Sequence, residues 1–382
     1  MDEVELTTQA RNKGVMPVCK YKGVLVMKMK KQSKFYSLAL TALLSVVTAG
    51  CSFWPGGGQE NNLPPNPTIT SVVAVSEDYY GSIVPYKPNQ TRGMLAGNSY
   101  RIDFSRLELG LMEIARDTFP TDEYLFQEGQ QIKAEQVSEW IAQYNIKAPD
   151  GKKKTGLLVN VLEHDYLEKQ QKQLAGMVLG ISLSPIYMDA TGKEKTYNTD
   201  ELRAKGQQVA ARIVQAVRAD NPQIPIVLAL YQVPDKNSTL VPGHFIMSGT
   251  VNANETAISK WQPINEEYFL FPSDVAEKNY AQQSLQFDKF KRQTQNFFGE
   301  YIGMTGLGRF MGGKLTELTI TATAEYDSRT EVLQFTQFAA AAIDEAFDKS
   351  VHVNLYVQSI NRPLAIYIRP ASGEPYMHIY RQ

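Results

Sequence analysis

The residue with the clearest chemistry in this sequence is Cys51, which follows an apolar run and three small residues in "TALLSVVTAGCSF". A membrane-bound enzyme can acylate a thiol in this position. Two or three acyl chains hold a soluble domain on a bilayer, since each buried CH₂ contributes about 0.8 kcal/mol. The small residues Thr48, Ala49 and Gly50 fit a signal peptidase site. The stretch therefore predicts cleavage between Gly50 and Cys51 and lipidation of the new N-terminus at Cys51.

The segment before Cys51 has the layout of a bacterial signal peptide. Starting from Met27 or Met29, four lysines form a basic n-region and residues 35–47 form an apolar h-region. The run is shorter than the ~20 residues of a membrane-spanning helix. The other interpretation is a buried core helix with a chance cysteine, but such a helix should show polar residues at helical spacing.

We interpret residues 27–50 as a lipoprotein signal peptide. The small residues 48–50 before Cys51 are similar to a bacterial lipobox, although Thr48 stands where Leu, Val or Ile is usual. Residues 1–26 fit no targeting pattern, and we interpret them as an extension from a mis-assigned upstream start. The true start codon stays open between Met27 and Met29.

The composition after Cys51 divides the rest of the chain in two. Residues 51–77 include "FWPGGGQENNLPPNP", whose glycines, prolines and amides cannot bury enough surface to fold, so we expect a flexible tether. Residues 78–382 have a globular composition. Of 39 basic and 40 acidic residues, 31 and 37 lie after residue 50. This acidic balance argues against nucleic acid as a partner, because phosphate binding needs a concentrated basic face.

Common catalytic and metal-binding motifs are missing from the sequence. The four histidines show no HxxxH or HExxH spacing, both cysteines precede the globular region, and no GxSxG elbow supplies a serine nucleophile. "GRFMGGKL" (308–315) fits the GxxxxGK start of a phosphate-binding loop. However, leucine replaces the required Ser or Thr and a helix is expected before it, which favours a glycine-rich helix-to-strand turn.

A possible carboxylate pair lies in "EHDYL", where a strand would place Glu163 and Asp165 on one face and His164 on the other. We interpret this stretch as an exposed strand end. A hydrolase with convergent carboxylates is the least favoured hypothesis for the domain. The sequence thus predicts no enzyme, no catalytic residues, no metal and no cofactor apart from the diacylglycerol on Cys51.

Aromatic and basic side chains are concentrated in "DYYGSIVPYKPNQTRGML" (78–95), and Tyr79, Tyr80, Tyr86 and Arg92 stand out. Among glycines and prolines, these residues could line a groove for a peptide or a cell-wall glycan. An extended arm packed across the domain is the other interpretation. An open cleft lined by these side chains would support the groove, and full burial would exclude it.

The periodicity of apolar residues predicts an α+β fold, with mixed or antiparallel sheets packed by helices on one side. Helices are predicted at 107–119, 133–146, 199–220, 280–303 and 331–347, with Thr199 or Asp200 as the cap of the third. Strands are predicted at 155–167, 175–188, 225–233, 244–252, 314–326, 351–358, 363–370 and 375–381. Two successive strand-helix-strand-strand clusters suggest two related halves, although their sequences do not align. The alternation in "LTITATAEY" indicates a sheet with one covered and one wetter face.

Several ordered stretches between residues 78 and 382 resemble the CamS family of Gram-positive lipoproteins, also called sex-pheromone precursor lipoproteins. They are "YYGSIVPYKPNQTRGML", "FPTDEYLFQEGQ", "GMVLGISLSPIYM", "IPIVLALYQ", "VPGHFI", "WQPINEEYFLFPS" and "PYMHIY". The resemblance implies a domain anchored by membrane lipid at the outer face of the cell membrane, facing the cell wall.

The resemblance also implies a second product, a hydrophobic octapeptide from the end of the signal peptide. Its residues here would be Leu43, Leu44, Ser45, Val46, Val47, Thr48, Ala49 and Gly50. A signal peptidase would cut before Cys51, and a membrane protease would release the fragment. A binding module for peptide or cell-wall glycan is the other functional hypothesis for the globular domain.

Overall fold

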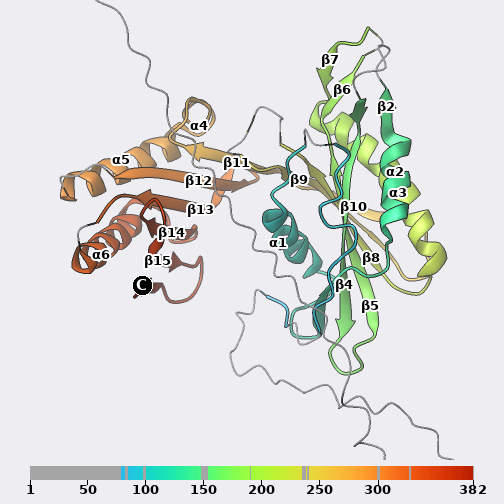
Figure 1. Cartoon of the computed structure of the whole chain (residues 1–382), viewed down its shortest axis with the longest axis horizontal. Coiled ribbons are helices and arrows are strands. Elements are labelled where there is room, and N and C mark those ends of the chain that lie inside the picture. Colours follow the sequence, from blue (N-terminus) through green and yellow to red (C-terminus); the bar gives the residue numbers. More distant parts are fainter. Residues whose placement is uncertain are drawn as a thin grey trace, which may run out of the picture. The chain divides into compact units, whose positions relative to one another are not determined.

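The computed structural model describes residues 79–81, 85–97, 100–147, 154–189, 191–234, 238, 241–298, 302–326 and 328–381. All of these belong to one compact unit, Thr68–Gln382. Within it the chain forms two six-stranded sheets, each with its own helices and buried apolar core (Figure 1). The fold is α+β, as the sequence predicted. No helix in the described ranges is long and apolar enough to cross a bilayer.

The first sheet has the strand order β1-β4-β5-β8-β9-β10. Neighbouring strands pair antiparallel except β5 and β8, which are parallel. The strands are β1 (Tyr124–Glu128), β4 (Leu158–Glu168), β5 (Leu174–Leu183), β8 (Ile226–Gln232), β9 (His244–Val251) and β10 (Ser259–Pro263). Two short hairpins accompany them, formed by β2 (Asn145–Lys147) with β3 (Lys154–Gly156) and by β6 (Ile186–Met188) with β7 (Glu194–Thr196).

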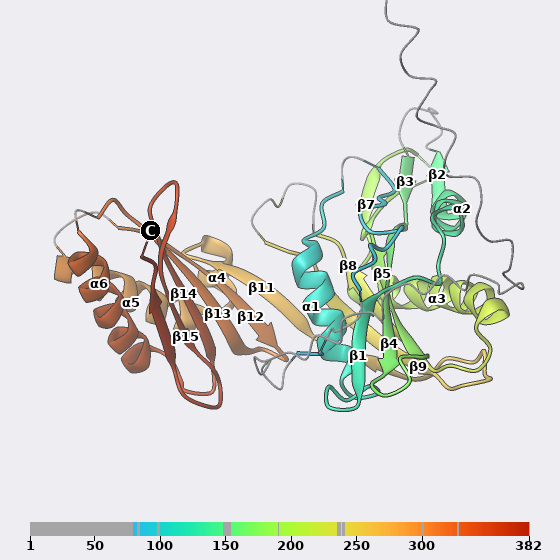
Figure 2. The ribbon, with the colours of Figure 1, turned by 60° about the horizontal axis from the view of Figure 1, so that its bottom comes forward.

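Helices cover both faces of the first sheet (Figures 1 and 2). On one face lies α1 (Phe104–Ala115), and on the other lie α2 (Ala134–Tyr144) and α3 (Thr199–Asp220). This arrangement explains the nearly continuous apolar sequence of β5, because Val178 belongs to the core under α1 while its neighbours Met177 and Leu179 belong to the other core. The prediction that helices cover one side only is wrong for this sheet.

The N-terminus of α3 is fixed by Asn198 rather than by the predicted Thr199 or Asp200. The Asn198 side chain accepts a hydrogen bond from the Glu201 backbone N–H at 2.9 Å, and the Glu201 carboxylate accepts one from the Asn198 N–H at 3.0 Å. This is a capping box. Asn198, Thr199 and Asp200 can each cap a helix. The reciprocal hydrogen bonds with Glu201 make Asn198 the cap.

The second sheet has the order β11-β12-β13-β14-β15-β16, and only β13 and β14 are parallel. The strands are β11 (Glu266–Phe271), β12 (Gly303–Met311), β13 (Lys314–Thr323), β14 (His352–Gln358), β15 (Pro363–Arg369) and β16 (Tyr376–Ile379). The helices are α4 (Asp274–Asn279), α5 (Ala281–Phe298) and α6 (Arg329–Ala346), and α5 and α6 pack together on one face (Figure 2). Along β13 the burial alternates, so the predicted covered and wetter faces are confirmed.

The two sheets have the same topology, which supports the predicted pair of related halves. In each half the third and fourth strands in the sheet are parallel, and every other neighbouring pair is antiparallel. In each half a long helix, α3 or α6, lies in the connection between the parallel strands. The sequence suggested two halves but could not show that their strands pair in the same order, because strand pairing depends on contacts between distant residues.

The glycine-rich stretch 308–315 is a hairpin turn between β12 and β13. Gly312 and Gly313 have φ values of +57° and +80°, a region that residues with a Cβ rarely adopt. A strand precedes the turn, where the sequence suggested a helix, and another strand follows. The stretch therefore lacks the helix N-terminus on which a phosphate-binding loop depends.

Candidate functional site

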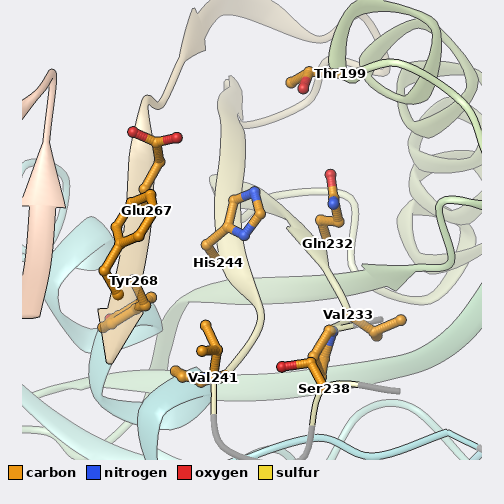
Figure 3. Close-up of a pocket in the computed structure, with 11 residues that line it drawn as sticks. Thr199, Gln232, Val233, Ser238, Val241, His244, Glu267 and Tyr268 are labelled. Carbon is orange, nitrogen blue, oxygen red and sulfur yellow. The ribbon is translucent and has the colours of Figure 1, made fainter. Parts of the chain in front are cut away.

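A cavity of about 350 Å³ is the candidate functional site (Figure 3). This volume lies within the range of pockets that hold small molecules. Polar and apolar residues from separate parts of the chain surround it. The lining residues are Thr199, Gln232, Val233, Pro234, Ser238, Val241, Pro242, His244, Glu267, Tyr268 and Phe269.

The fold explains why these residues meet. Gln232 is the last residue of β8 and faces His244, the first residue of β9, across the antiparallel pair. Thr199 opens α3, which lies in the connection between the parallel strands β5 and β8. The cavity thus lies at the carboxyl end of β8 and the start of the crossover helix, where open sheets with parallel strands commonly bind ligands. The remaining walls come from β11 in the second sheet and from the connection between β8 and β9, which contributes Val233, Pro234, Ser238, Val241 and Pro242.

His244 supplies a neutral imidazole to the cavity. Burial lowers the pKa of His244 below its usual value, and the positive charge of Arg203 acts in the same direction, while Glu267 opposes both. A neutral imidazole offers one hydrogen-bond donor and one acceptor. Figure 3 shows its ring between the strand that carries Glu267 and the end of the strand that carries Gln232.

Glu267 supplies a carboxylate, and a hydrogen bond to one of its two oxygens holds it in position. Its Oε2 accepts a hydrogen bond from the Tyr280 hydroxyl at 2.8 Å. Burial and the adjacent Glu267 raise the pKa of Tyr280 to about 12, so this hydroxyl stays protonated and donates at neutral pH. The neighbouring Tyr268 donates its hydroxyl to Glu266 at 3.2 Å. The hydrogen bond from the Tyr280 hydroxyl therefore orients the carboxylate of Glu267.

The "EHDYL" stretch does not form an exposed strand end, because Glu163, His164 and Asp165 are all at most 1% exposed in the middle of the first sheet. The backbone N–H groups of residues 130–132 donate to the two carboxyl groups. Burial raises the pKa of Asp165 to about 9, and the negative charge of Glu163 adds to the shift. The two acids therefore share a proton at neutral pH.

This carboxyl pair is a structural feature rather than a hydrolytic dyad. A hydrolytic pair needs a water molecule and a substrate between the carboxyl groups. Here the oxygens are turned toward the backbone of the loop that starts at Gly129, and a Cβ at this glycine would lie 2.3 Å from the Glu163 side chain. The close packing leaves the pair no access to a substrate.

The four residues proposed for a groove are placed differently from one another. Tyr80 is buried and donates its hydroxyl to the Phe119 carbonyl at 2.6 Å, as expected for a packed arm. Tyr79 and Tyr86 are 50% and 72% exposed, and Arg92 pairs with Glu108 and Glu128. None of the four lines the cavity described above. The groove at this segment stays a prediction.

The residues with the clearest sequence signal, Cys51 and the predicted cleavage site after Gly50, lie outside the described residues, as does the predicted peptide 43–50. The cavity residues were missed by motif reasoning because they match no catalytic pattern. A signal was nevertheless present, since "IPIVLALYQ", "VPGHFI" and "WQPINEEYFLFPS" carried the family resemblance and contain Gln232, His244 and Glu267.

The fold is that of an α+β protein with two topologically equivalent halves and a cavity of about 350 Å³. Within the described ranges no group of three His, Cys, Asp or Glu side chains is placed to hold a metal ion. A family model described as "CamS sex pheromone cAM373 precursor" matches residues 86–374. The chain therefore belongs to the CamS family, and the resemblance seen in the sequence is confirmed.

Solved structures that are similar to this chain include two pheromone precursors. A sex pheromone precursor from Lactobacillus salivarius has a TM-score of 0.68 and 24% identity, covering 80% of this chain and 97% of that one. The C-terminal domain of the sex pheromone staph-cAM373 precursor from Staphylococcus aureus has a TM-score of 0.63 and 24% identity, covering 73% and 96%. At this identity the comparisons show a shared fold. The family and both structures are described as pheromone precursors, not as enzymes. No curated protein matches the chain significantly.

Proposed function

We propose that this protein is a lipoprotein anchored by lipid at the outer face of the cell membrane, whose signal peptide supplies a hydrophobic peptide signal. The observation that carries this proposal is the junction at Cys51, a basic and then apolar segment ending in small residues before one cysteine. Membership of a pheromone-precursor family supports it. Diacylglycerol on Cys51 is the only attached group that the proposal requires, and membrane lipid is the partner.

Replacement of Cys51 by alanine should abolish acylation and release the domain from the membrane. The physical reason is that no other group in the proposed mature chain carries acyl chains, each of which contributes about 0.8 kcal/mol per buried CH₂. Metabolic labelling with a fatty acid and membrane fractionation in a Gram-positive host measure both effects. Ser52→Ala, next to the predicted lipidation site, is the matched control and should keep full labelling. Label that remains on the Cys51→Ala protein would contradict the anchor.

The peptide "LLSVVTAG" (43–50) should be released and should act on cells that sense such peptides. Its eight residues carry no charged side chain, so the fragment can leave a bilayer and still fit a receptor pocket. A synthetic copy should cause clumping of a responsive donor strain at nanomolar to micromolar concentration. The matched control is the same peptide with its residues in scrambled order. If the peptide causes no clumping in several donor strains, the proposed signalling role is wrong.

We also propose a binding role for the globular domain, because the cavity of about 350 Å³ is a specific feature that anchoring does not explain. The cavity combines apolar walls with a few convergent polar groups, as small-molecule sites do. The predicted binding module would accordingly use the cavity between β9 and β11 instead of the segment 78–95.

A further inference from the structure

We propose that the cavity bounded by β9 and β11 binds a small ligand that carries a primary ammonium group beside hydroxyl or amide groups. The inference rests on the proposed binding role and specifies its chemistry. Two sources share this chemistry, an amino sugar and the amine-bearing side chain of a short peptide. The argument depends on charge, on hydrogen-bonding capacity and on the apolar walls.

The charge around the cavity favours a cation. Glu267 is the one charged side chain among the residues that line it in the described part of the chain. Its carboxylate is exposed, and in that part of the chain no lysine or arginine forms an ion pair with it. The Tyr280 hydroxyl donates a hydrogen bond to Oε2 of Glu267. An ammonium group on the cavity side would complete the interactions of this carboxylate with a charge-assisted hydrogen bond.

The positive end of α3 does not make the cavity an anion site. Asn198 and Glu201 cap the helix reciprocally, and Asp200 adds a second acid to the first turn. Arg203 of this helix pairs with Asp200 at 3.0 Å and donates to the carbonyl oxygens of Ile246 and Ile264 and to the Asn265 side chain. The acids therefore offset the helix dipole that would otherwise attract an anion.

The other polar groups suit the neutral part of such a ligand. Neutral His244, the Gln232 amide and the Ser238 hydroxyl together offer donors and acceptors without adding a charge. Val233, Pro234, Val241 and Pro242 supply an apolar surface for the carbon skeleton of the ligand. One carboxylate, several neutral polar groups and apolar walls match an ammonium-bearing ligand better than an anion or a purely apolar molecule.

Isothermal titration calorimetry of the full chain at pH 7 tests this proposal with two matched pairs of probes. Glucosamine is compared with N-acetylglucosamine, and Nα-acetyl-lysine amide with Nα-acetyl-norleucine amide, so that within each pair mainly the charged amine differs. The variants are Glu267→Gln, which removes the charge, and Val241→Trp, which fills the cavity. Glu277→Gln on the exposed face of α4 is the matched control. Circular dichroism establishes that each variant is folded.

At least one ammonium probe should bind, with a Kd lower than that of its uncharged counterpart by about tenfold. Glu267→Gln should weaken this binding by about fivefold, the size expected for one partly exposed ion pair. Glu277→Gln should have no effect, and Val241→Trp should abolish binding. The pair that shows the difference identifies the source as sugar or peptide.

Three results would contradict the proposal in different ways. If uncharged probes bind as tightly as charged ones and Val241→Trp abolishes both, the ammonium inference is wrong while the binding role stands. If none of the four probes binds, the inference and the binding role are both contradicted. A Glu267→Gln variant with unchanged affinity would also exclude Glu267 as the group that recognises the amine.

Discussion

Asp165→Asn should leave the first sheet folded, whereas Glu163→Gln should destabilise it by about 2–4 kcal/mol. Glu163 accepts from the backbone N–H groups of Gln131 and Ile132, so an amide NH₂ there would face donors. Asp165 accepts a hydrogen bond from the Gln130 N–H through Oδ2, its Oδ1 is buried, and its interaction with Glu163 raises the pKa of Asp165. Asparagine can reproduce this arrangement, because its NH₂ replaces the protonated oxygen and donates to Glu163.

The same pair should make the stability of the protein fall as pH rises from 7 to 9. The folded pKa of Asp165, about 9, lies above its unfolded value. A group with a raised folded pKa contributes stability that is fully present below the unfolded pKa and is lost as pH rises through the folded one. His164 does not disturb this window, since its pKa is lowered by burial to about 3 and its contribution to stability is lost only below pH ~6.5.

Urea unfolding of the full chain at pH 7, 8 and 9 measures both effects. The parent chain should lose stability across this range, and Asp165→Asn should show a flatter dependence. Asp122→Asn at an exposed position is the matched control and should follow the parent chain. An Asp165→Asn variant with the parental pH dependence, or a Glu163→Gln variant of parental stability, would show that the proton does not reside on Asp165.

Arg309→Met should destabilise the protein by about 3–5 kcal/mol, because it leaves a buried carboxylate without its cation. The side chain of Glu266 is only 2% exposed and binds the Arg309 Nε at 2.6 Å. Its other oxygen accepts from the Phe245 backbone N–H at 2.7 Å. Arg309 also forms a bidentate pair with Glu113 of α1, with distances of 3.1 and 2.7 Å. The arginine thus joins elements of both halves.

Calorimetric unfolding of Arg309→Met, Glu113→Gln and the double variant Arg309→Met with Glu266→Gln tests this network. Glu113→Gln should cost only about 1 kcal/mol, because the Glu113 side chain is 38% exposed. The double variant should recover part of the loss, since it also removes the unpaired charge. Equal losses for Arg309→Met and Glu113→Gln would mean that the buried charge of Glu266 does not dominate.

Sequence reasoning was most successful for elements whose pattern is local and regular. The predicted helix at 199–220 has the observed bounds of α3, and the strand at 314–326 contains β13. Both have a repeating apolar pattern, which secondary structure imposes on neighbours in the chain. The helix predicted at 280–303 extended too far, because Gly303 already belongs to β12. The last four residues of that strand, 308–311, belong to the stretch that was interpreted as a glycine-rich turn.

The sequence by itself determined the α+β class and the family, because both depend on local patterns of residues along the chain. The junction at Cys51 stays a prediction from the sequence. Only the tertiary structure decided that Glu163 and Asp165 are buried, since the backbone N–H groups that bind them come from a loop more than thirty residues earlier. It likewise decided that His244 and Glu267 line one cavity. Burial and convergence depend on strand pairing between distant segments, and no local pattern of apolar residues specifies that pairing.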